Sequence, residues 1–490
     1  MGGRRPDGRD RTSDRRGAQA RSGRQAGAVH ARSRIDDILF YALLILVALA
    51  PLPLGSVYPL ASAVLALAVG VLLVLHAAAL ARRRSVFTQT LGPLSPIIFP
   101  FLLVLAWAGL QATPWTPASW HHPLWREAGA ALREPLAGAV SVDPGETAFV
   151  LLRLLCYGGI FWLALQLGRR PERAAMALIG LSVAGIAYAA YGLVDKFSGA
   201  NMVLWYVKTA YRDTVTGPFV NRNSFATYAG LGLLCLSGLI VKLSEETASP
   251  RASGRFRAVQ FIEALGGGRV LLVAGWAVLL TALLLTDSRG GVVSGLVGLA
   301  AFLAAIWTRP KPGRAGARLA AAAIVLGGLG LVAWSGEQVE LRLADTTPQS
   351  EQRAIVYELA LKGIDRSPGF GTGLGTFAEA FRFDRDDRIH GYWDKAHDTY
   401  IEDALELGIP ATLILLTGLA AMLLRCAKGV RDRRRDSVYS CVGVGATILV
   451  AVHSLVDFSL AIPAIAATYA LIMGVAVAQS WRTEEVVAHE

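Results

Sequence analysis

The chain has 490 residues, a formal net charge of +11 and a mean hydropathy of +0.45; 53% of its residues are hydrophobic and 17% are charged. A soluble chain of this length does not need so large an apolar fraction to fill its cores, so the composition excludes an ordinary soluble protein. The positive charge does not indicate nucleic-acid binding either, because the basic residues stand in short clusters between apolar runs, where they orient membrane helices.

The N-terminal segment, residues 1–34, is rich in arginine, glycine, serine and aspartate and holds almost no large apolar side chain. Such a composition does not bury enough surface to offset its ordering entropy, which predicts a disordered, basic cytoplasmic tail. The pair Arg15 and Arg16 does not indicate an export signal, because no apolar stretch follows for roughly twenty residues.

The rest of the chain alternates between long apolar runs and short polar connections. A membrane span needs about twenty mostly apolar residues. We therefore predict an all-α polytopic membrane protein with about twelve transmembrane helices, nine in residues 35–334 and three in residues 399–480, followed by a short cytoplasmic tail over 481–490. The predicted spans are 37–54, 57–81, 96–112, 148–168, 174–197, 223–242, 270–286, 291–307, 317–334, 399–425, 437–456 and 459–480.

The distribution of arginine between these runs predicts the topology. Counted from the basic tail, every second connection is cationic, as cytoplasmic loops are. The basic clusters are Arg82 to Arg84, Arg169 to Arg173, Arg251 to Arg257, Arg309 to Arg318 and Arg431 to Arg435. Both termini are then cytoplasmic in a bacterial inner membrane, and the long connections 113–147, 198–222 and 335–398 face the periplasm.

The longest of these connections, residues 335–398 between the ninth and tenth spans, is predicted to be an ordered periplasmic cap, because unstructured loops of this length are unusual. Within it, residues 351–364 have the pattern of an amphipathic helix whose apolar side faces the membrane or the helix bundle, flanked by Arg353 and Tyr357.

Two arginines at the outer ends of predicted spans are candidates for anion binding. Arg222 lies between Asn221 and Asn223, and Arg289 follows Ser288 in a turn so short that its guanidinium stays at membrane depth. Snorkelling at the interface is the alternative explanation for such an arginine. A pair of arginines, however, is suited to gripping phosphate oxygens bidentately, and we predict that the two act together.

His397 is the candidate general base. It stands beside a predicted helix start on the periplasmic side, with Asp394 and Asp398 close in sequence. A helix N-terminus disfavours the imidazolium form, which leaves a neutral ring able to accept a proton. A simple capping or interfacial role remains the alternative, and the roles of Glu402 and Glu406, which follow on the same helix face, stay open.

Two further patterns indicate no cofactor and no metal. The glycine string over residues 369–375 resembles a dinucleotide fingerprint in its letters, but no strand precedes it, so a tight turn over the site is the preferred interpretation. The four cysteines lie in apolar runs without a paired spacing, which argues against a disulfide framework and a zinc site.

The order of these motifs resembles the O-antigen ligase and O-antigen polymerase superfamily. The similarity extends over roughly residues 35–480 and is strongest from about 205 to 410. The motifs that carry it are Asn-Arg-Asn at 221–223, Ser-Arg-Gly-Gly at 288–291, Arg353 with the glycine string, Ala-His-Asp at 396–398, Glu-Leu-Gly at 406–408 and Ser-Val-Asp-Pro at 141–144.

This resemblance implies a metal-independent glycosyltransferase of the GT-C type, without a cofactor, that takes a glycan from undecaprenyl pyrophosphate. The implied acceptor is lipid A-core in ligases and another lipid-linked glycan in polymerases. Arg222 and Arg289 would hold the pyrophosphate and His397 would deprotonate or orient the acceptor hydroxyl. The implied substrate contacts are Asn221, Asn223, Ser288, Arg353, Tyr357 and Asp398; Asp398 stands where relatives often have Asn or Ser.

The main alternative class is a transporter, such as a flippase for lipid-linked glycans. Transporters usually show two similar halves and a midplane site, whereas here the polar motifs gather at one side and the long cap loop lies only in the second half. A scaffolding protein has no reason to keep charges at membrane depth. Ligase and polymerase stay open alternatives, as do the sugar, the acceptor and the oligomeric state.

Overall fold

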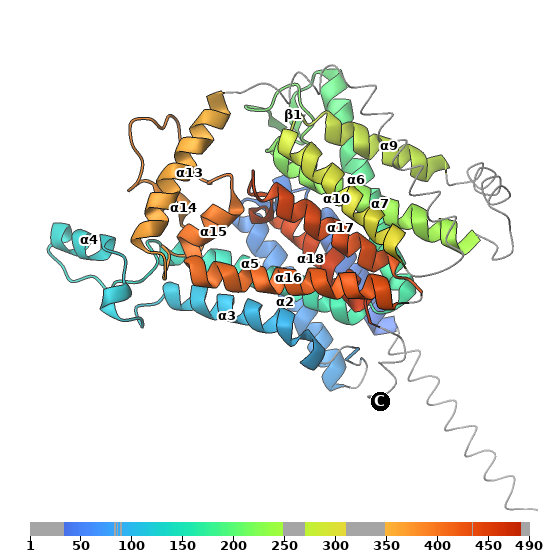
Figure 1. Cartoon of the computed structure of the whole chain (residues 1–490), viewed down its shortest axis with the longest axis horizontal. Helices are drawn as coiled ribbons and strands as arrows, with labels where there is room; N and C mark the ends of the chain where they lie inside the picture. The colour runs from blue at the N-terminus through green and yellow to red at the C-terminus, as the bar shows by residue number, and fades with distance from the viewer. Residues whose placement is uncertain are drawn as a thin grey trace, which may run out of the picture.

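The computed structural model describes residues 34–82, 85, 87–88, 91–247, 270–309, 348–433 and 435–481. Within them the fold is helical, with one two-stranded hairpin and several short 3₁₀ turns (Figure 1). The elements are a helix over 34–49, α2 (Pro59–Ala81), α3 (Ser95–Gln111), α4 (Leu124–Leu132), α5 (Pro144–Leu167), α6 (Pro171–Ser198), β1 (Met202–Val203), β2 (Tyr206–Val207), α7 (Arg222–Thr247), α9 (Val270–Leu284), α10 (Arg289–Thr308), α13 (Pro348–Arg366), α14 (Phe377–Phe381), α15 (Thr399–Leu407), α16 (Ile409–Asp432), α17 (Val438–His453) and α18 (Pro463–Ala478).

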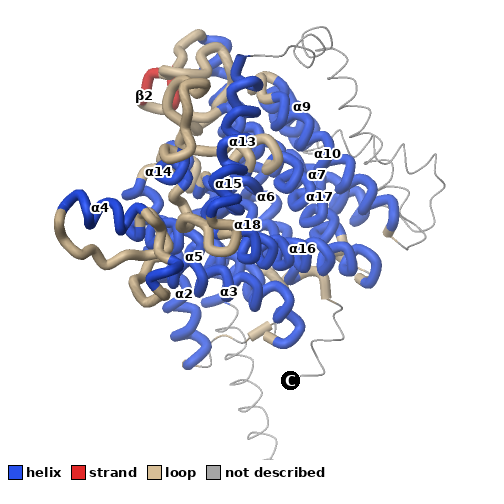
Figure 2. The backbone as a smooth tube through the Cα atoms, turned by 60° about the vertical axis from the view of Figure 1, so that its left-hand side comes forward, coloured by secondary structure: helices blue, strands red, loops and turns tan. Residues whose placement is uncertain are grey.

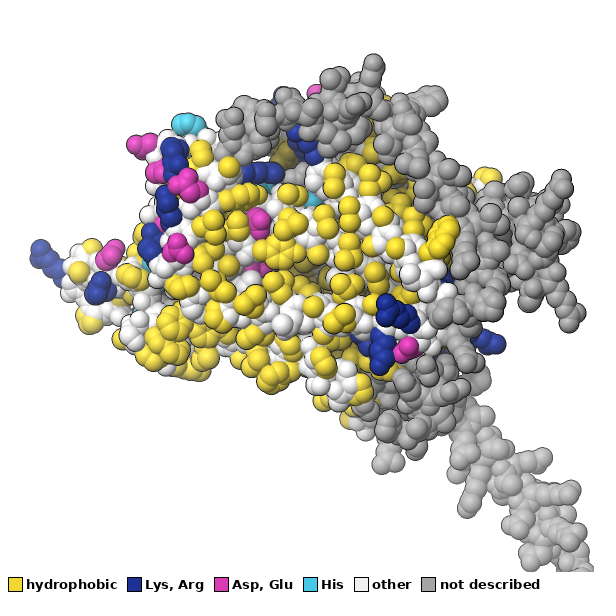
Figure 3. Space-filling view, in the orientation of Figure 1, with side chains coloured by type: hydrophobic (Ala, Val, Ile, Leu, Met, Phe, Trp, Pro, Cys, Tyr) yellow, Lys and Arg dark blue, Asp and Glu magenta, His cyan; other side chains and the backbone are white. Residues whose placement is uncertain are grey.

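The described helices have the length and composition of a polytopic membrane protein. Seven are long and apolar enough to cross a membrane, namely α2, α3 with the turn before it, α5, α6, α7, α10 and α16, and α9, α17 and α18 are shorter apolar helices. Large apolar side chains such as Leu60 and Val74 are 77% and 68% exposed. Figure 3 shows hydrophobic side chains over the middle of the molecule and charged ones gathered toward its ends. An apolar surface of this extent is suited to contact with membrane lipid.

Helix α7 is the central element of the bundle. Its membrane-length segment is entirely buried inside the protein, and it packs against α6, α9, α10, α17 and α18 (Figures 1 and 2). The first residue of α7, Arg222, therefore stands in the middle of one end of the bundle, surrounded by the ends of helices that come from distant parts of the sequence.

Each predicted span that the structure describes coincides with one helix, with a single exception. The span predicted over 317–334 lies outside the described residues, so the total of twelve is not confirmed. The exception is 399–425, which is two helices, α15 and α16, separated at Gly408. Gly408 has a φ of +81°, and Pro410 in the first turn of α16 favours a new helix start. The apolar span is therefore α16, and α15 belongs with the cap.

Described arginines from the predicted cytoplasmic loops join helix ends at one end of the bundle. Arg173 pairs with Asp37 at 2.8 Å, and Arg309 pairs with Glu245 at 2.6 Å. Arg169, in the connection between α5 and α6, donates to the carbonyl of Trp481 at 3.1 Å, just after α18. The helix ends that these arginines join thus lie together, as the charge alternation predicted for them, and the cap lies at the opposite end of the described bundle (Figure 1).

The cap is a small helical unit with its own apolar core. The predicted amphipathic helix is α13, and its buried Val356 and Leu359 pack with Phe377, Phe381 and Leu405 of α14 and α15. Its apolar side therefore faces the rest of the cap, because two further short helices supply a nearer apolar surface than the membrane. Residues 335–347 of the predicted cap loop lie outside the described residues.

The glycine string is a tight turn within the cap, with positive φ at Gly371, Gly373 and Gly375. The Glu406 carboxylate accepts hydrogen bonds from the backbone N–H groups of Gly375, at 2.6 Å, and Phe377, at 2.9 Å. Glu402 instead pairs with Lys395 at 2.7 Å and accepts from the N–H of Ala396 at 3.0 Å. Both glutamates, whose roles the sequence left open, bind groups of the cap itself.

Candidate active site

A histidine and an aspartate form the centre of the site. Nδ1 of His397 lies 3.2 Å from Oδ1 of Asp457, although 60 residues separate them. The side chain of Asp457 is fully buried, whereas that of His397 is 17% exposed. Burial raises the pKa of Asp457, but the hydrogen bond from His397, the neighbouring histidine charges and Asn223 outweigh it, so its pKa lies below that of an ordinary carboxyl.

This pairing defines which nitrogen of His397 is free. An ionised carboxylate only accepts hydrogen bonds, so Nδ1 of His397 is protonated and donates a hydrogen bond to Asp457. In a neutral imidazole Nε2 is then the acceptor. The arrangement therefore leaves one ring nitrogen available to take a proton from another molecule.

The backbone and two aromatic rings fix the orientation of the His397 ring. His397 has a φ of +59°, a left-handed conformation that costs energy for a residue with a side chain. Its ring packs edge-on against Trp393 and Phe458, at centroid distances of 5.6 Å and 4.9 Å. The hydroxyl of Tyr357 donates to the His397 carbonyl at 3.0 Å. Asp398 caps α15 by accepting from two backbone N–H groups of its first turn.

Arg353 brings a guanidinium from the cap to the same place. Its Nη2 lies 3.4 Å from Nδ1 of His397, and its Nη1 donates to the carbonyl of Val456 at 3.4 Å. Since Arg353 and the protonated Nδ1 are both donors, the first contact places a positive charge beside the ring without being a strong hydrogen bond.

Asn221, Arg222 and Asn223 meet the site at the start of α7. The Asn221 side chain accepts from the N–H of Asn223 at 2.8 Å and so caps the helix, while Nδ2 of Asn223 donates to Oδ1 of Asp457 at 3.2 Å. Nε of Arg222 is buried and has no hydrogen-bond partner among the described residues. A buried donor without a partner calls for an explanation, and an anionic ligand supplies one.

Tyr211, which the sequence did not indicate, supports Arg222. The guanidinium carbon of Arg222 lies 5.2 Å from the centre of the Tyr211 ring, within cation–π distance. Burial raises the pKa of Tyr211 above its ordinary value, although the positive charges of Arg222 and Arg353 oppose this shift.

The turn before α10 carries Ser288 and Arg289 to the edge of the site. Ser288 caps α10 by accepting from the N–H of Gly291 at 3.1 Å, and Arg289 is half-buried at the first position of the helix. A Cβ atom on Gly290 would lie 2.6 Å from a methyl group of Val456. The absence of a side chain at Gly290 thus permits the close approach of Val456, the residue that precedes Asp457.

A buried polar network lies behind Asp457. Ser459 donates to Oδ2 of Asp457 at 3.0 Å, and Oγ1 of Thr227 lies 2.6 Å from Nδ1 of His453 and 2.9 Å from Ser459. These contacts tie α7, the end of α17 and the turn before α18 together. The sequence offered one signal for this group, an aspartate between two apolar spans, because a charge at membrane depth is usually functional.

The structure thus brings together most of the residues that the sequence indicated. Asn223 and His397 contact Asp457, and Arg353 and Tyr357 contact His397. Arg222 adjoins Asn223 in the first turn of α7, and Gly290, next to Arg289, lies against Val456. Asn221, Ser288 and Asp398 cap α7, α10 and α15. Within the described part of the chain, no group of three or more His, Cys, Asp or Glu side chains has the arrangement of a metal site.

These features define a helical, polytopic membrane protein with a buried polar site at one end of its bundle. Residues 274–416 match the family model described as O-antigen ligase, which confirms over that segment the resemblance seen in the motifs. The match includes Arg289, Arg353 and His397, and it supports a ligase or polymerase type of function in general. No curated protein matches the chain.

Proposed function

We propose that the protein is a glycosyltransferase that moves a glycan from undecaprenyl pyrophosphate to an acceptor hydroxyl at the periplasmic face of the bacterial inner membrane. The acceptor is lipid A-core or a growing polysaccharide. The observation that supports this most directly is the pairing of His397 with Asp457 beside the guanidinium of Arg353, in a chain that matches the O-antigen ligase family model over residues 274–416. Arg222 and Arg289 begin the helices α7 and α10, whose ends also contact the segment around Asp457.

In the proposed reaction, Nε2 of His397 accepts the proton of the acceptor hydroxyl, and the hydroxyl oxygen attacks the anomeric carbon of the donor sugar. The bond between that carbon and the pyrophosphate oxygen breaks, and undecaprenyl pyrophosphate leaves with the electron pair. Asp457 stabilises the imidazolium that forms, as a buried carboxylate does in hydrolytic triads. Its contribution requires the ionised form, which its lowered pKa favours.

Arg222 and Arg289 bind the leaving group in this proposal. Charge develops on the pyrophosphate as the glycosidic bond breaks, and guanidinium groups fixed in advance at that position lower the barrier. Arg222 is suited to this role because its buried Nε is a donor that no described residue uses and its guanidinium lies over the ring of Tyr211.

The test is transfer by the purified protein in lipid nanodiscs, supplied with a glycan on undecaprenyl pyrophosphate and, in separate reactions, lipid A-core or a second lipid-linked glycan. The expected result is release of undecaprenyl pyrophosphate together with a larger acceptor, abolished in His397→Ala and Arg289→Ala proteins that still insert. The acceptor that is elongated identifies a ligase or a polymerase. Full activity of either variant, or no transfer to any acceptor by the unaltered protein, contradicts the proposal.

A further inference from the structure

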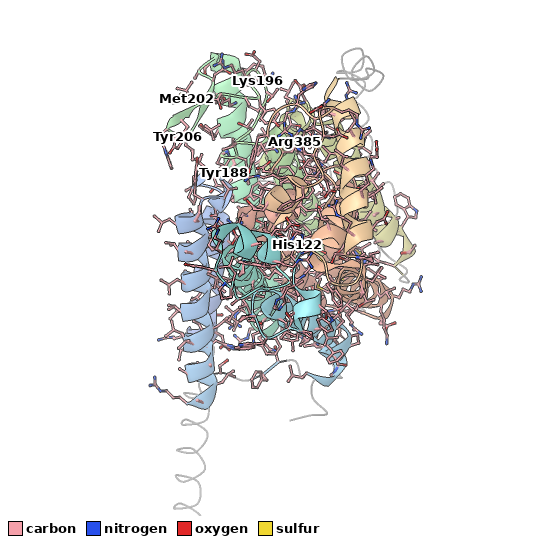
Figure 4. The ribbon with its side chains drawn as sticks, turned by 90° about the vertical axis from the view of Figure 1, so that its left-hand side faces the viewer. His122, Tyr188, Lys196, Met202, Tyr206 and Arg385 are labelled. Atoms are coloured by element: carbon pink, nitrogen blue, oxygen red, sulfur yellow. The ribbon has the colours of Figure 1, made fainter. Side chains whose placement is uncertain are left out.

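A short β-hairpin at the cap end of α6 exposes an unusually apolar tip. Strands β1 and β2 pair in antiparallel register, Met202 with Val207 and Val203 with Tyr206. Trp205 and Val207 are 65% exposed and Tyr206 is 50% exposed. Figure 4 shows Met202 and Tyr206 at one edge of the molecule, near Lys196. Residues 197–207 contain no charged side chain.

The hairpin is held firmly by the last turns of α6. Lys208 and Asp195 form a buried ion pair at 2.7 Å, and the second oxygen of Asp195 accepts from the N–H of Met202 at 2.7 Å. The Tyr191 hydroxyl accepts from the N–H of Leu204 at 2.6 Å. Leu204 itself has a φ of +53°, a strained value for such a residue, which these contacts maintain. The exposed tip is therefore a fixed feature of the fold.

The apolar tip continues the outer face of a membrane helix. Along α6, the side chains of Val183, Val194 and Phe197 are 60%, 67% and 74% exposed and, with Ala187 and Ala190, form one stripe at helical spacing. Since α6 has the length and composition of a membrane span, this stripe faces lipid. The hairpin begins four residues after the helix ends, so its tip lies where the stripe leaves the hydrocarbon.

We propose that Trp205, Tyr206 and Val207 insert into the headgroup layer of the phospholipid leaflet on the cap side of the bundle. Tryptophan and tyrosine favour this depth because their rings are apolar and their N–H and O–H groups remain hydrated. The absence of charge in residues 197–207 and the continuity with the lipid-facing stripe favour a bilayer over a protein partner. The same loop leads directly to Tyr211 and Arg222, so this anchor fixes their height relative to the membrane.

Spin-label accessibility tests the proposal independently of any enzymatic activity. The four native cysteines are buried, so a nitroxide on Trp205→Cys labels one site in the full chain reconstituted into phosphatidylcholine and phosphatidylglycerol vesicles. Val183→Cys on the stripe of α6 is the lipid reference, and Tyr392→Cys on the cap, where the native side chain is 66% exposed, is the water reference. Val207→Cys is a second reporter should Trp205→Cys fail to fold.

The expected result is a ratio of oxygen collisions to collisions with a water-soluble nickel complex at 205 or 207 that lies clearly between the ratios at positions 183 and 392, because oxygen concentrates in the hydrocarbon, the nickel complex concentrates in water, and the headgroup layer lies between them. Collisions dominated by the nickel complex, as at position 392, overturn the proposal. Exclusion of both reagents from 205 and 207 overturns it as well, because it means that a protein surface, such as a second copy of this chain, covers the tip.

Discussion

Asn223 donates a hydrogen bond to the same oxygen of Asp457 that His397 faces, at 3.2 Å in both cases. The contact joins the first turn of the central helix α7 to the turn between α17 and α18, and through it to the cap that carries His397. One buried carboxylate thus connects the three parts of the chain that form the site, and its chemistry gives the first prediction.

Asp457→Asn keeps the size of the side chain but removes its negative charge. We expect the glycan transfer rate to fall by about 10²–10⁴-fold, because the amide neither enforces the proton on Nδ1 of His397 nor stabilises the imidazolium. Release of undecaprenyl pyrophosphate by the purified variant measures the effect. Asp386→Asn, on the exposed surface of the cap, is the matched control and should retain the original rate; equal rates for the two variants exclude the proposed role of Asp457.

Arg222→Gln removes a guanidinium while keeping a polar side chain. Hydrogen bonds to charged groups contribute about 1.5–3 kcal/mol, so we expect the KM for the lipid-pyrophosphate donor to rise by about 10- to 100-fold. Initial rates over a range of donor concentrations measure it. Arg366→Gln, at an exposed position of α13, should leave KM unchanged, and a similar KM for both variants argues against phosphate binding by Arg222.

Tyr211 is expected to act through its ring. Tyr211→Phe keeps the surface on which Arg222 lies and should change the donor KM by less than about threefold, whereas Tyr211→Ala should approach the Arg222→Gln value because a cation–π contact contributes about 0.5–2 kcal/mol. The comparison of KM in the two variants distinguishes this support from a hydrogen bond of the hydroxyl. A large effect in Tyr211→Phe would point to the hydroxyl instead.

Gly373→Ala should loosen the base of the cap. Gly373 has a φ of +108°, and an added Cβ would lie 2.8 Å from the Cα of Ser141, so we expect a loss of about 1–3 kcal/mol from backbone strain alone. Thermal unfolding in detergent and protease cleavage of the cap report it. Gly369→Ala, in the same string but with nothing within 4 Å of the added atom, is the control and should melt like the unaltered protein.

The lowered pKa of Asp457 predicts how its contribution to stability depends on pH. A carboxyl whose pKa is lower in the folded state stabilises the fold fully above its ordinary pKa of about 3.9, and the contribution is lost as the pH falls through the folded value. The difference in melting temperature between the unaltered protein and Asp457→Asn should therefore be constant between about pH 5 and about pH 8, where an ordinary carboxyl is already ionised. It should shrink in stronger acid. A difference that instead grows on acidification contradicts the lowered pKa.

The sequence by itself determined the class of the protein. Apolar runs of membrane length and arginines in alternate connections predicted most of the described helices and which of their ends share a side, because lipid requires long apolar helices and basic loops resist translocation. Short polar motifs at the ends of these runs also indicated Arg222, Arg289, Arg353 and His397 as candidates for the site, since charged side chains at that depth are rarely present without a function.

Tertiary structure alone decided which residues meet. The pairing of His397 with Asp457, the position of Arg222 over Tyr211 and the burial of α13 against α14 and α15 all join segments far apart in sequence, and no local pattern encodes such contacts. The break at Gly408 was missed for a related reason: hydropathy registers an uninterrupted stretch over 399–425, whereas the backbone turns there because Gly408 permits a conformation that lets the cap and α16 pack in different directions.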